Sequence, residues 1–155
     1  MKIVKELPKS ILYSLYLHFA SSSFLVKNKE TLPVIVSLTS IPSRFSSLNL
    51  VIKNLFNQSY LPEKIILWLH EDLKNKLPKA IEKLQSSLVE IKYSPLTCSH
   101  KKLIQTLKNK LESIIITCDD DLIYGKKLIE NFYEEHLKYF TLISYNKAYT
   151  NNKLN

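Results

Sequence analysis

The strongest constraint on the fold is an alternation of short apolar runs with longer amphipathic segments between residues 33 and 138. Four runs are short and rich in β-branched and other aliphatic residues: 33–40 (PVIVSLTS), 64–69 (KIILWL), 88–93 (LVEIKY) and 114–118 (IIITC). Runs of this kind are typical of strands that are buried on both faces of a sheet. We therefore predict an α/β fold, with a mostly parallel sheet and helices on both of its faces.

The segments between these runs predict the connecting helices. The first helix has apolar residues at helical spacing and ends before residues 58–62; these residues are Leu48, Val51, Ile52, Leu55 and Phe56. A second crossover at 71–87 is helical or partly helical and is interrupted at Pro78. No internal repeat is present.

Two further helices and one more strand are predicted in the second half. One helix begins near Ser99 and carries four apolar residues on one face: Leu103, Ile104, Leu107 and Leu111. The last helix runs from about residue 126 to residue 138. Residues 140–146 (FTLISYN) then predict a fifth strand.

The first 30 residues differ from the rest of the chain. Three lysines (Lys2, Lys5, Lys9) precede an apolar block at 11–20, which is shorter than the ~20 residues of a membrane-spanning helix. Three interpretations remain open: a signal peptide cleaved near residues 20–23, an amphipathic helix on a membrane surface, and a helix packed on its own domain. We expect a helical segment at 1–30, a domain at 31–146 and a polar tail at 147–155.

The composition limits the kinds of ligand and partner that the chain can bind. The net charge of +8 indicates anionic partners, but the 22 basic residues are spread along the chain, which argues against nucleic acid. With a single glycine, Gly125, the chain has neither a dinucleotide fingerprint nor a phosphate loop. Cys98 and Cys118 lack metal-ligand spacing, and we interpret them as free thiols in the cytoplasm.

An acidic triplet, Asp119 to Asp121, directly follows the run 114–118. In parallel sheets, ligands bind outside the carboxyl ends of the strands. Three adjacent carboxylates repel one another, and a divalent cation relieves that repulsion. We predict that Asp119 and Asp121 hold Mg²⁺ or Mn²⁺, ions that are usually shared with substrate phosphates. A solvated loop or a helix N-terminus is the alternative interpretation.

The order of these motifs resembles the nucleotide-binding half of glycosyltransferases with the GT-A fold. The resemblance is to family 2-like bacterial enzymes that build surface polysaccharides, and it covers residues 33–138. It rests on "VIVSLTSIPSRFSSLNLVIKNLFNQSYLPEKIILWLHED" and "SHKKLIQTLKNKLESIIITCDDDLIYGKKLIENFYEEH". The resemblance implies a Rossmann-like sheet and transfer of a sugar from a nucleotide diphosphate sugar, with a uridine diphosphate sugar favoured.

The resemblance also implies roles for particular residues. A loop beneath the nucleotide base corresponds to residues 39–44, with Thr39 and Arg44 as contacts. The second strand would deliver His70 or Glu71 near the base, and a lysine before the fourth strand matches Lys101 or Lys102. The metal motif, Asp-x-Asp, matches Asp119 and Asp121, and Asp120 joins the nucleotide-sugar contacts.

The chain departs from the family after this motif. Such enzymes usually continue with an acceptor pocket and, in inverting members, a catalytic carboxylate, whereas no acidic residue follows Glu135 here. We therefore expect the nucleotide-binding half of an incomplete GT-A domain. We expect its transfer to a glycan or lipid-linked acceptor to be slow without a companion polypeptide, and the catalytic base is not identified. The alternatives are a non-catalytic binding or partner module and a metal-dependent phosphoryl-transfer enzyme.

The lysines and the apolar block of the first 30 residues suggest peripheral contact with the inner face of a membrane.

Overall fold

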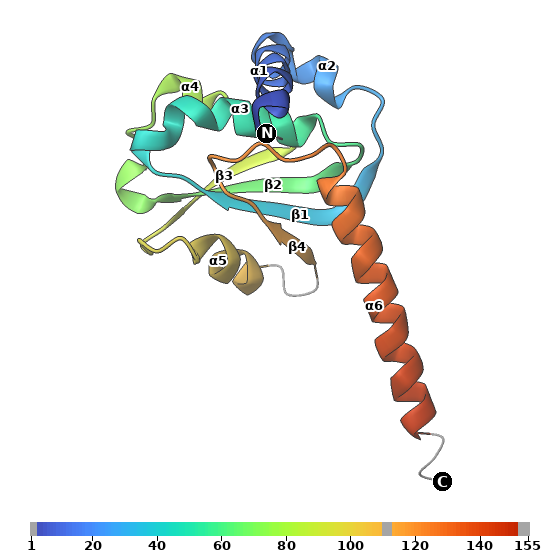
Figure 1. The fold of residues 1–155 in the computed structure, drawn as a ribbon. Helices are drawn as coiled ribbons and strands as arrows, with labels where there is room; N and C mark the ends of the chain where they lie inside the picture. The colour runs from blue at the N-terminus through green and yellow to red at the C-terminus, as the bar shows by residue number, and fades with distance from the viewer. Residues whose placement is uncertain (1–2, 110–112, 152–155) are drawn as a thin grey trace.

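The protein folds around a four-stranded parallel sheet (Figure 1). The computed structural model describes residues 3–109 and 113–151, and the side chains of residues 11–109 and 113–139. The strands are β1 (Thr31–Thr39), β2 (Leu61–His70), β3 (Val89–Ser94) and β4 (Ile114–Thr117). The predicted α/β class, the parallel sheet and all four strands between residues 33 and 118 are confirmed.

The strand order places β1 between β2 and β4. The order is β3-β2-β1-β4, so β1 pairs with β2 on one side and with β4 on the other. The chain moves outward from β1 to β2 and β3, and then returns to add β4 beside β1. The direction of winding therefore reverses between β1 and β4, and such a switch point is where ligands bind in open α/β sheets.

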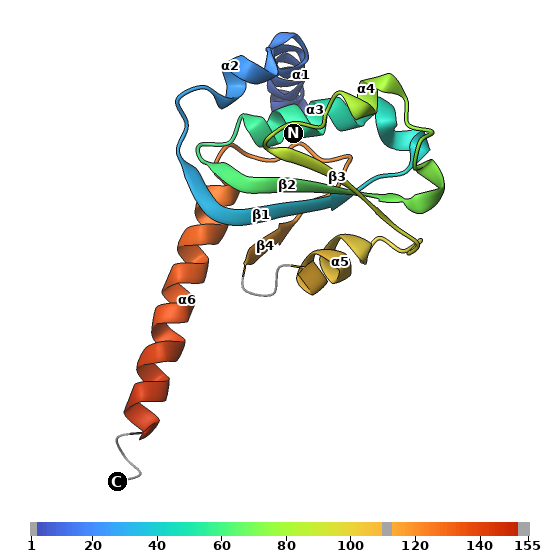
Figure 2. The ribbon, with the colours of Figure 1, turned by 180° about the vertical axis from the view of Figure 1, so that it is seen from behind.

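One face of the sheet carries most of the core. Four helices lie on this side: α1 (Ile3–Phe19), α2 (Ser22–Val26), α3 (Phe45–Phe56) and α4 (Lys79–Glu82), as Figures 1 and 2 show from opposite sides. Leu48, Ile52 and Leu55 form the buried stripe of α3 and meet the alternating residues Val34, Val36 and Leu38 of β1. The apolar face of α3, with its helical spacing, thus packs on the face of β1 formed by alternate residues. Together they bury the largest apolar cluster of the described residues.

The opposite face is covered by the single short helix α5 (Lys101–Asn109) (Figure 2). Its buried side is polar: the Thr106 hydroxyl lies 2.8 Å from that of Ser37 and accepts a 2.8 Å hydrogen bond from the indole N–H of Trp68. The predicted apolar face of this helix points away from the sheet, because Leu103, Ile104 and Leu107 are exposed. Leu111, also assigned to that face, lies outside the described residues.

The prediction for the end of the chain needs correction. The predicted strand at 140–146 is wrong, because these residues belong to α6 (Leu128–Asn151). No glycine or proline occurs between residues 126 and 151, so nothing in the sequence ends the helix. The predicted boundary between residues 146 and 147 therefore falls inside α6. The prediction for the crossover 71–87 is confirmed: it is partly helical, in the 3₁₀ turn η2 (Glu71–Leu73) and in α4, and Pro78 at the N-cap of α4 separates the two.

The N-terminal helices pack on the domain. Leu17 of α1 and Leu25 of α2 are buried in the main core, and the Tyr13 hydroxyl accepts hydrogen bonds from the side-chain amides of Asn54 and Asn57. The other side of α1 is apolar and exposed, with Leu12 66% and Phe19 82% accessible. Within the described part of the chain, no helix combines the length and apolarity needed to cross a membrane.

The polar contact under α5 gives the first testable prediction. Replacing Thr106 by Val keeps the shape of the side chain but removes the acceptor for the buried Trp68 N–H. We expect a loss of about 1–3 kcal/mol in the free energy of unfolding, the usual effect of leaving a buried donor unsatisfied. The measurement is urea unfolding followed by tryptophan fluorescence, since Trp68 is the only tryptophan.

The control is Leu103→Gln, an exposed change on the same helix. It should alter the free energy of unfolding by no more than about 0.5 kcal/mol. Equal effects of the two substitutions would contradict the view that a buried hydrogen bond holds α5 on the sheet.

Candidate functional site

A pocket of about 210 Å³ lies at the carboxyl ends of β1 and β4, at the switch point. Three segments line it: the residues that end and follow β1, the turn that leads into α5, and the first residues after β4. The lining side chains are Thr39, Ser40, Ile41, Arg44, Thr97, Cys98, Ser99, Lys101, Lys102, Asp119 and Asp120. Residues distant in sequence meet here because parallel strands share one carboxyl edge.

The β1 side of the pocket is shaped by a tight turn. The Thr39 hydroxyl donates a 2.7 Å hydrogen bond to the Trp68 carbonyl, which ties the end of β1 to β2. Pro42 is the first residue of the 3₁₀ turn η1 (Pro42–Arg44). The fixed φ angle of proline suits the first position of a helical turn. This turn brings the Arg44 guanidinium to the end of β4, where it contacts the acidic triplet.

Asp120 is the buried anchor of the acidic triplet. Its carboxylate accepts a 2.6 Å hydrogen bond from the Ser40 hydroxyl and a 2.9 Å hydrogen bond from the Arg44 guanidinium. Arg44 also lies 3.2 Å from the carboxylate of Asp121, which is half exposed. The hydrogen bond with Asp120, followed by the negative charges of Asp120 and Asp121, raises the pKa of Arg44 above its ordinary value.

Lysines form the α5 side of the pocket. The Lys102 ammonium contacts the Asp119 carboxylate at 2.5 Å and donates a 3.0 Å hydrogen bond to the Cys118 carbonyl. Lys101 is almost fully buried in the pocket wall, and this burial lowers its pKa from the ordinary value. An anion bound beside Lys101 would favour the charged form of this side chain.

The aspartates are thus balanced by the protein's own cations. Sequence reasoning assigned the relief of their repulsion to a divalent ion, but Lys102 contacts Asp119, and Arg44 contacts both Asp120 and Asp121. The triplet is therefore compatible with a folded chain before any ligand binds. A ligand that draws away Arg44 or Lys102 would leave carboxylates ready for a second cation.

The residues partly fit a magnesium or manganese site. Asp119 and Asp121 have exposed side chains beside the pocket and are hard oxygen donors. Within residues 3–109 and 113–151, no group of three or more His, Cys, Asp or Glu side chains is placed to hold a metal ion. The two carboxylates therefore suit an ion only if substrate phosphates supply further oxygen ligands, as is usual for Mg²⁺.

Tyr124 and Asn54 hold the loop after β4 in place. The Tyr124 hydroxyl accepts a 2.7 Å hydrogen bond from the backbone N–H of Asp119. The Asn54 side chain accepts from the Tyr124 backbone N–H at 2.8 Å and donates to the Tyr124 carbonyl at 2.9 Å. Burial raises the pKa of Tyr124 to about 12 and that of the nearby Cys118 thiol to about 11, so both groups stay neutral near pH 7.

Sequence reasoning missed several of these residues. Asn54 carries a signal in hindsight, because it is a polar residue among the apolar positions of α3. Thr97, Cys98 and Ser99 follow β3 and reach the same edge of the sheet, which the strand order would have indicated. The role of Tyr124 has no signal in the sequence, since its contacts join segments 70 residues apart.

His70 and Glu71 are not among the side chains that line this pocket. The His70 ring lies 3.2 Å from the Pro95 carbonyl and 3.2 Å from the Asp72 carboxylate, next to the turn η2. Glu71 begins that turn and is exposed. His70 ends β2 and Glu71 follows it. β1 separates β2 from β4, so the two residues lie at the same edge of the sheet but not in the pocket.

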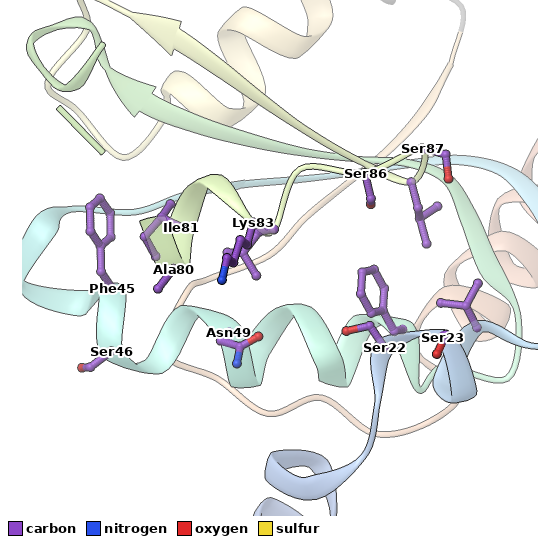
Figure 3. A pocket seen from close by; sticks show the side chains of 14 residues that line it. Ser22, Ser23, Phe45, Ser46, Asn49, Ala80, Ile81, Lys83, Ser86 and Ser87 are labelled. Atoms are coloured by element: carbon purple, nitrogen blue, oxygen red, sulfur yellow. The ribbon is translucent and has the colours of Figure 1, made fainter. Parts of the chain in front are cut away.

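A larger groove of about 660 Å³ runs beside α3 and is bounded by α2, α4 and the residues before β3 (Figure 3). Its walls are mainly apolar, with Phe45, Phe56 and Ile81 among them, and its polar side chains are serines, Asn49 and Lys83. No carboxylate and only one cation line it. This groove lacks the charges that a metal ion and a diphosphate require, so the smaller pocket is the better candidate site.

Comparisons of the chain with protein-family models, curated proteins and solved structures give no match.

The position of Asp120 gives a second prediction. Asp120→Asn keeps the shape of the side chain but removes the buried charge that binds Ser40 and Arg44. We expect the free energy of unfolding to fall by about 1–3 kcal/mol, because buried hydrogen-bond partners lose a charged acceptor. Chemical denaturation at pH 7 measures this change.

Asp121→Asn is the matched control, because it removes the same charge from a half-exposed side chain. Its effect should stay within about 1 kcal/mol, as for most exposed ion pairs. A larger loss from Asp121→Asn than from Asp120→Asn would contradict the assignment of Asp120 as the anchor.

Proposed function

We propose that the chain binds a nucleotide diphosphate sugar and forms the donor-binding part of a GT-A-like glycosyltransferase. The observation that carries the proposal is the meeting of three cationic side chains and the acidic triplet at the switch point of a parallel sheet. Arg44, Lys101 and Lys102 line one pocket together with Asp119 and Asp120. This combination suits a ligand with a diphosphate and an accompanying divalent ion.

In this proposal each group has a task. Lys101 and Lys102 bind the phosphate oxygens, and the loop 39–44 lies beneath the base with Arg44 at its end. Asp119 and Asp121 would hold Mn²⁺ or Mg²⁺, whose charge would offset the negative charge that builds on the departing diphosphate. The Ser40–Asp120–Arg44 contacts keep this loop and the acidic triplet together.

The pocket volume of about 210 Å³ is below the usual range of about 300–1,000 Å³ for small-molecule sites. It has room for the phosphates, and the remainder of the ligand would lie along the exposed rim. His70 and Glu71 lie at the carboxyl end of β2, the neighbour of β1, and their proposed contact with the base stays a prediction. We favour a uridine diphosphate sugar as donor and a glycan or lipid-linked acceptor, in surface polysaccharide synthesis.

A non-catalytic binding module is the second candidate, and one observation favours it. Each carboxylate of the triplet contacts a cation, with Lys102 on Asp119 and Arg44 on the other two. A carboxylate held in an ion pair is not positioned to take a proton from an acceptor hydroxyl, so the triplet supplies no general base in this arrangement. We therefore propose that a companion polypeptide supplies the acceptor side of the reaction.

The third prediction tests donor binding by thermal unfolding. Mn²⁺ alone should raise the Tm by less than about 1 °C, whereas Mn²⁺ with uridine diphosphate at about ten times its Kd should raise it by about 3–6 °C. The difference arises because the phosphates complete the ligand shell of the ion. Alkylation of the pocket residue Cys98 should slow under the same conditions.

Two variants make this test specific. Asp121→Asn should abolish the joint shift, and Glu135→Gln, an exposed change on α6, should leave it intact. An unchanged joint shift in Asp121→Asn would show that the metal site is misassigned. Release of nucleotide from uridine and guanosine diphosphate sugars then separates the candidates, since acceptor-dependent turnover of ~1 per second or faster would indicate a complete enzyme. Phosphatase activity without sugar specificity would instead indicate phosphoryl transfer.

We also propose a location at the inner face of a membrane, in the cytoplasm. The exposed side of α1 carries Leu12, Leu15, Tyr16 and Phe19 at helical spacing. The net charge of +8 complements an anionic lipid surface.

Flotation with vesicles that contain anionic lipid is the fourth prediction. The unaltered chain should float with the vesicles, and the double variant Leu12→Gln/Phe19→Gln should stay behind, because both side chains are exposed. Leu103→Gln on the opposite face is the control and should float normally. Equal flotation of all three proteins would disprove attachment through α1.

A further inference from the structure

The polar face of helix α5 points to the sheet and its apolar face points to solvent, the reverse of the usual arrangement. Its polar residues face the sheet: Lys102 contacts Asp119, Gln105 donates to the Ser94 hydroxyl at 3.1 Å, and Thr106 bonds to Trp68. These positions recur at helical spacing, so the opposite stripe with Leu103, Ile104 and Leu107 must point to solvent. These three side chains are 37–40% accessible. A contiguous apolar stripe fixed outward by hydrogen bonds indicates a surface that binds another polypeptide.

The sheet face under α5 is thinly covered. Its buried apolar cluster contains only Ile35, Ile66 and Trp68 among the described residues, with the half-buried Ile115 of β4 packed against it. Strands of parallel sheets normally have helices over both faces. A helix docked against α5 beside β4 would complete this layer.

The projecting helix α6 has the properties of such an occupant. It is 24 residues long, about 36 Å at 1.5 Å per residue. Its first turns are held by Ile129 and Tyr133 in the main core, and Figures 1 and 2 both show the remainder leaving the body on the same side of the sheet as α5. Phe132 and Tyr139, seven residues apart and therefore on one side of the helix, are exposed.

The charges of the two helices are complementary. α5 contains no acidic residue; Lys101 is buried and Lys102 contacts Asp119, so Lys108 is its exposed cation. α6 contains Glu130, Glu134 and Glu135 and the lysines Lys138 and Lys147. Glu130 contacts Lys127 and Glu135 contacts Lys138 within the chain, so Glu134 is the acid considered for a partner. Lys108 and Glu134 are both exposed, so either can reach a partner.

We propose that two copies of the chain form a symmetric dimer in which α6 of each copy packs on the outward stripe of α5 in the other. A two-fold arrangement uses both surfaces twice and leaves neither exposed, as in most homodimers. The interface would also place the second copy beside Lys102 and the candidate site. This inference does not depend on the proposed function.

Sedimentation equilibrium of the full chain tests the dimer. We expect a reversible dimer with a Kd below about 100 µM. The variant Leu103→Gln/Ile104→Gln/Leu107→Gln should raise the Kd at least tenfold, because three exposed apolar contacts are lost without disturbing the fold. The matched control is Leu12→Gln/Phe19→Gln, which replaces exposed apolar residues of α1 and should leave the Kd unchanged.

Charge reversal tests whether α6 is the occupant. Lys108→Glu and Glu134→Lys should each raise the Kd roughly 2- to 5-fold at low salt. The chain with both reversals should regain most of the lost affinity, since the helices again carry opposite charges. A protein that stays monomeric at about 200 µM, a dimer unaffected by the triple variant, or no recovery in the doubly reversed chain would each overturn the proposal.

Discussion

The structure depends on the position of β1 between two parallel partners. Its alternate residues Val34, Val36 and Leu38 face the main core, while Ser37 on the other face reaches Thr106 of α5. The same pairing sets the site, because only the contact of β1 with β4 brings Ser40 to Asp120, which is 80 residues later in the chain. Because β1 lies between β2 and β4, the loop 39–44 lies next to the acidic triplet. Arg44 of this loop then supplies the positive charge that balances Asp120 and Asp121.

The two faces of this sheet are stabilised by different interactions. The α3 face is an apolar layer of helices, and its free energy comes from burial of aliphatic side chains. The α5 face depends on hydrogen bonds between Ser37, Thr106 and Trp68, with few apolar contacts. Burial of apolar area does not depend on direction, whereas hydrogen bonds fix a helix in one rotation. The rotation of α5 places Lys102 over Asp119 and, at the same time, turns Leu103 and Ile104 outward.

The candidate site holds three adjacent carboxylates together because cations from two segments, η1 and α5, contact them. Asp120 is buried beside Ser40 and is bound by the half-exposed Arg44, and Asp119 is balanced by Lys102 from α5. Tyr124, held by Asn54 of α3, fixes the backbone at Asp119. These contacts connect the site to both faces of the sheet. A ligand that competes for Arg44 and Lys102 would therefore act on groups whose positions are already set by the fold.

The sequence by itself determined the class of the fold and the edge at which the acidic triplet lies. The runs at 33–40, 64–69, 88–93 and 114–118 predicted their strands because short runs rich in β-branched and other aliphatic residues suit a parallel sheet, and Asp119 and Asp121 follow the last run. The extent of α6 could not be read in this way, since the β-branched and aromatic residues of 140–146 suit a strand equally well. Only the tertiary structure decided that Asp120 points inward to Arg44, that Tyr124 supports Asp119, and that the apolar face of α5 points outward. Periodicity shows which residues share a face, but the direction of that face depends on contacts between segments that are distant in the chain.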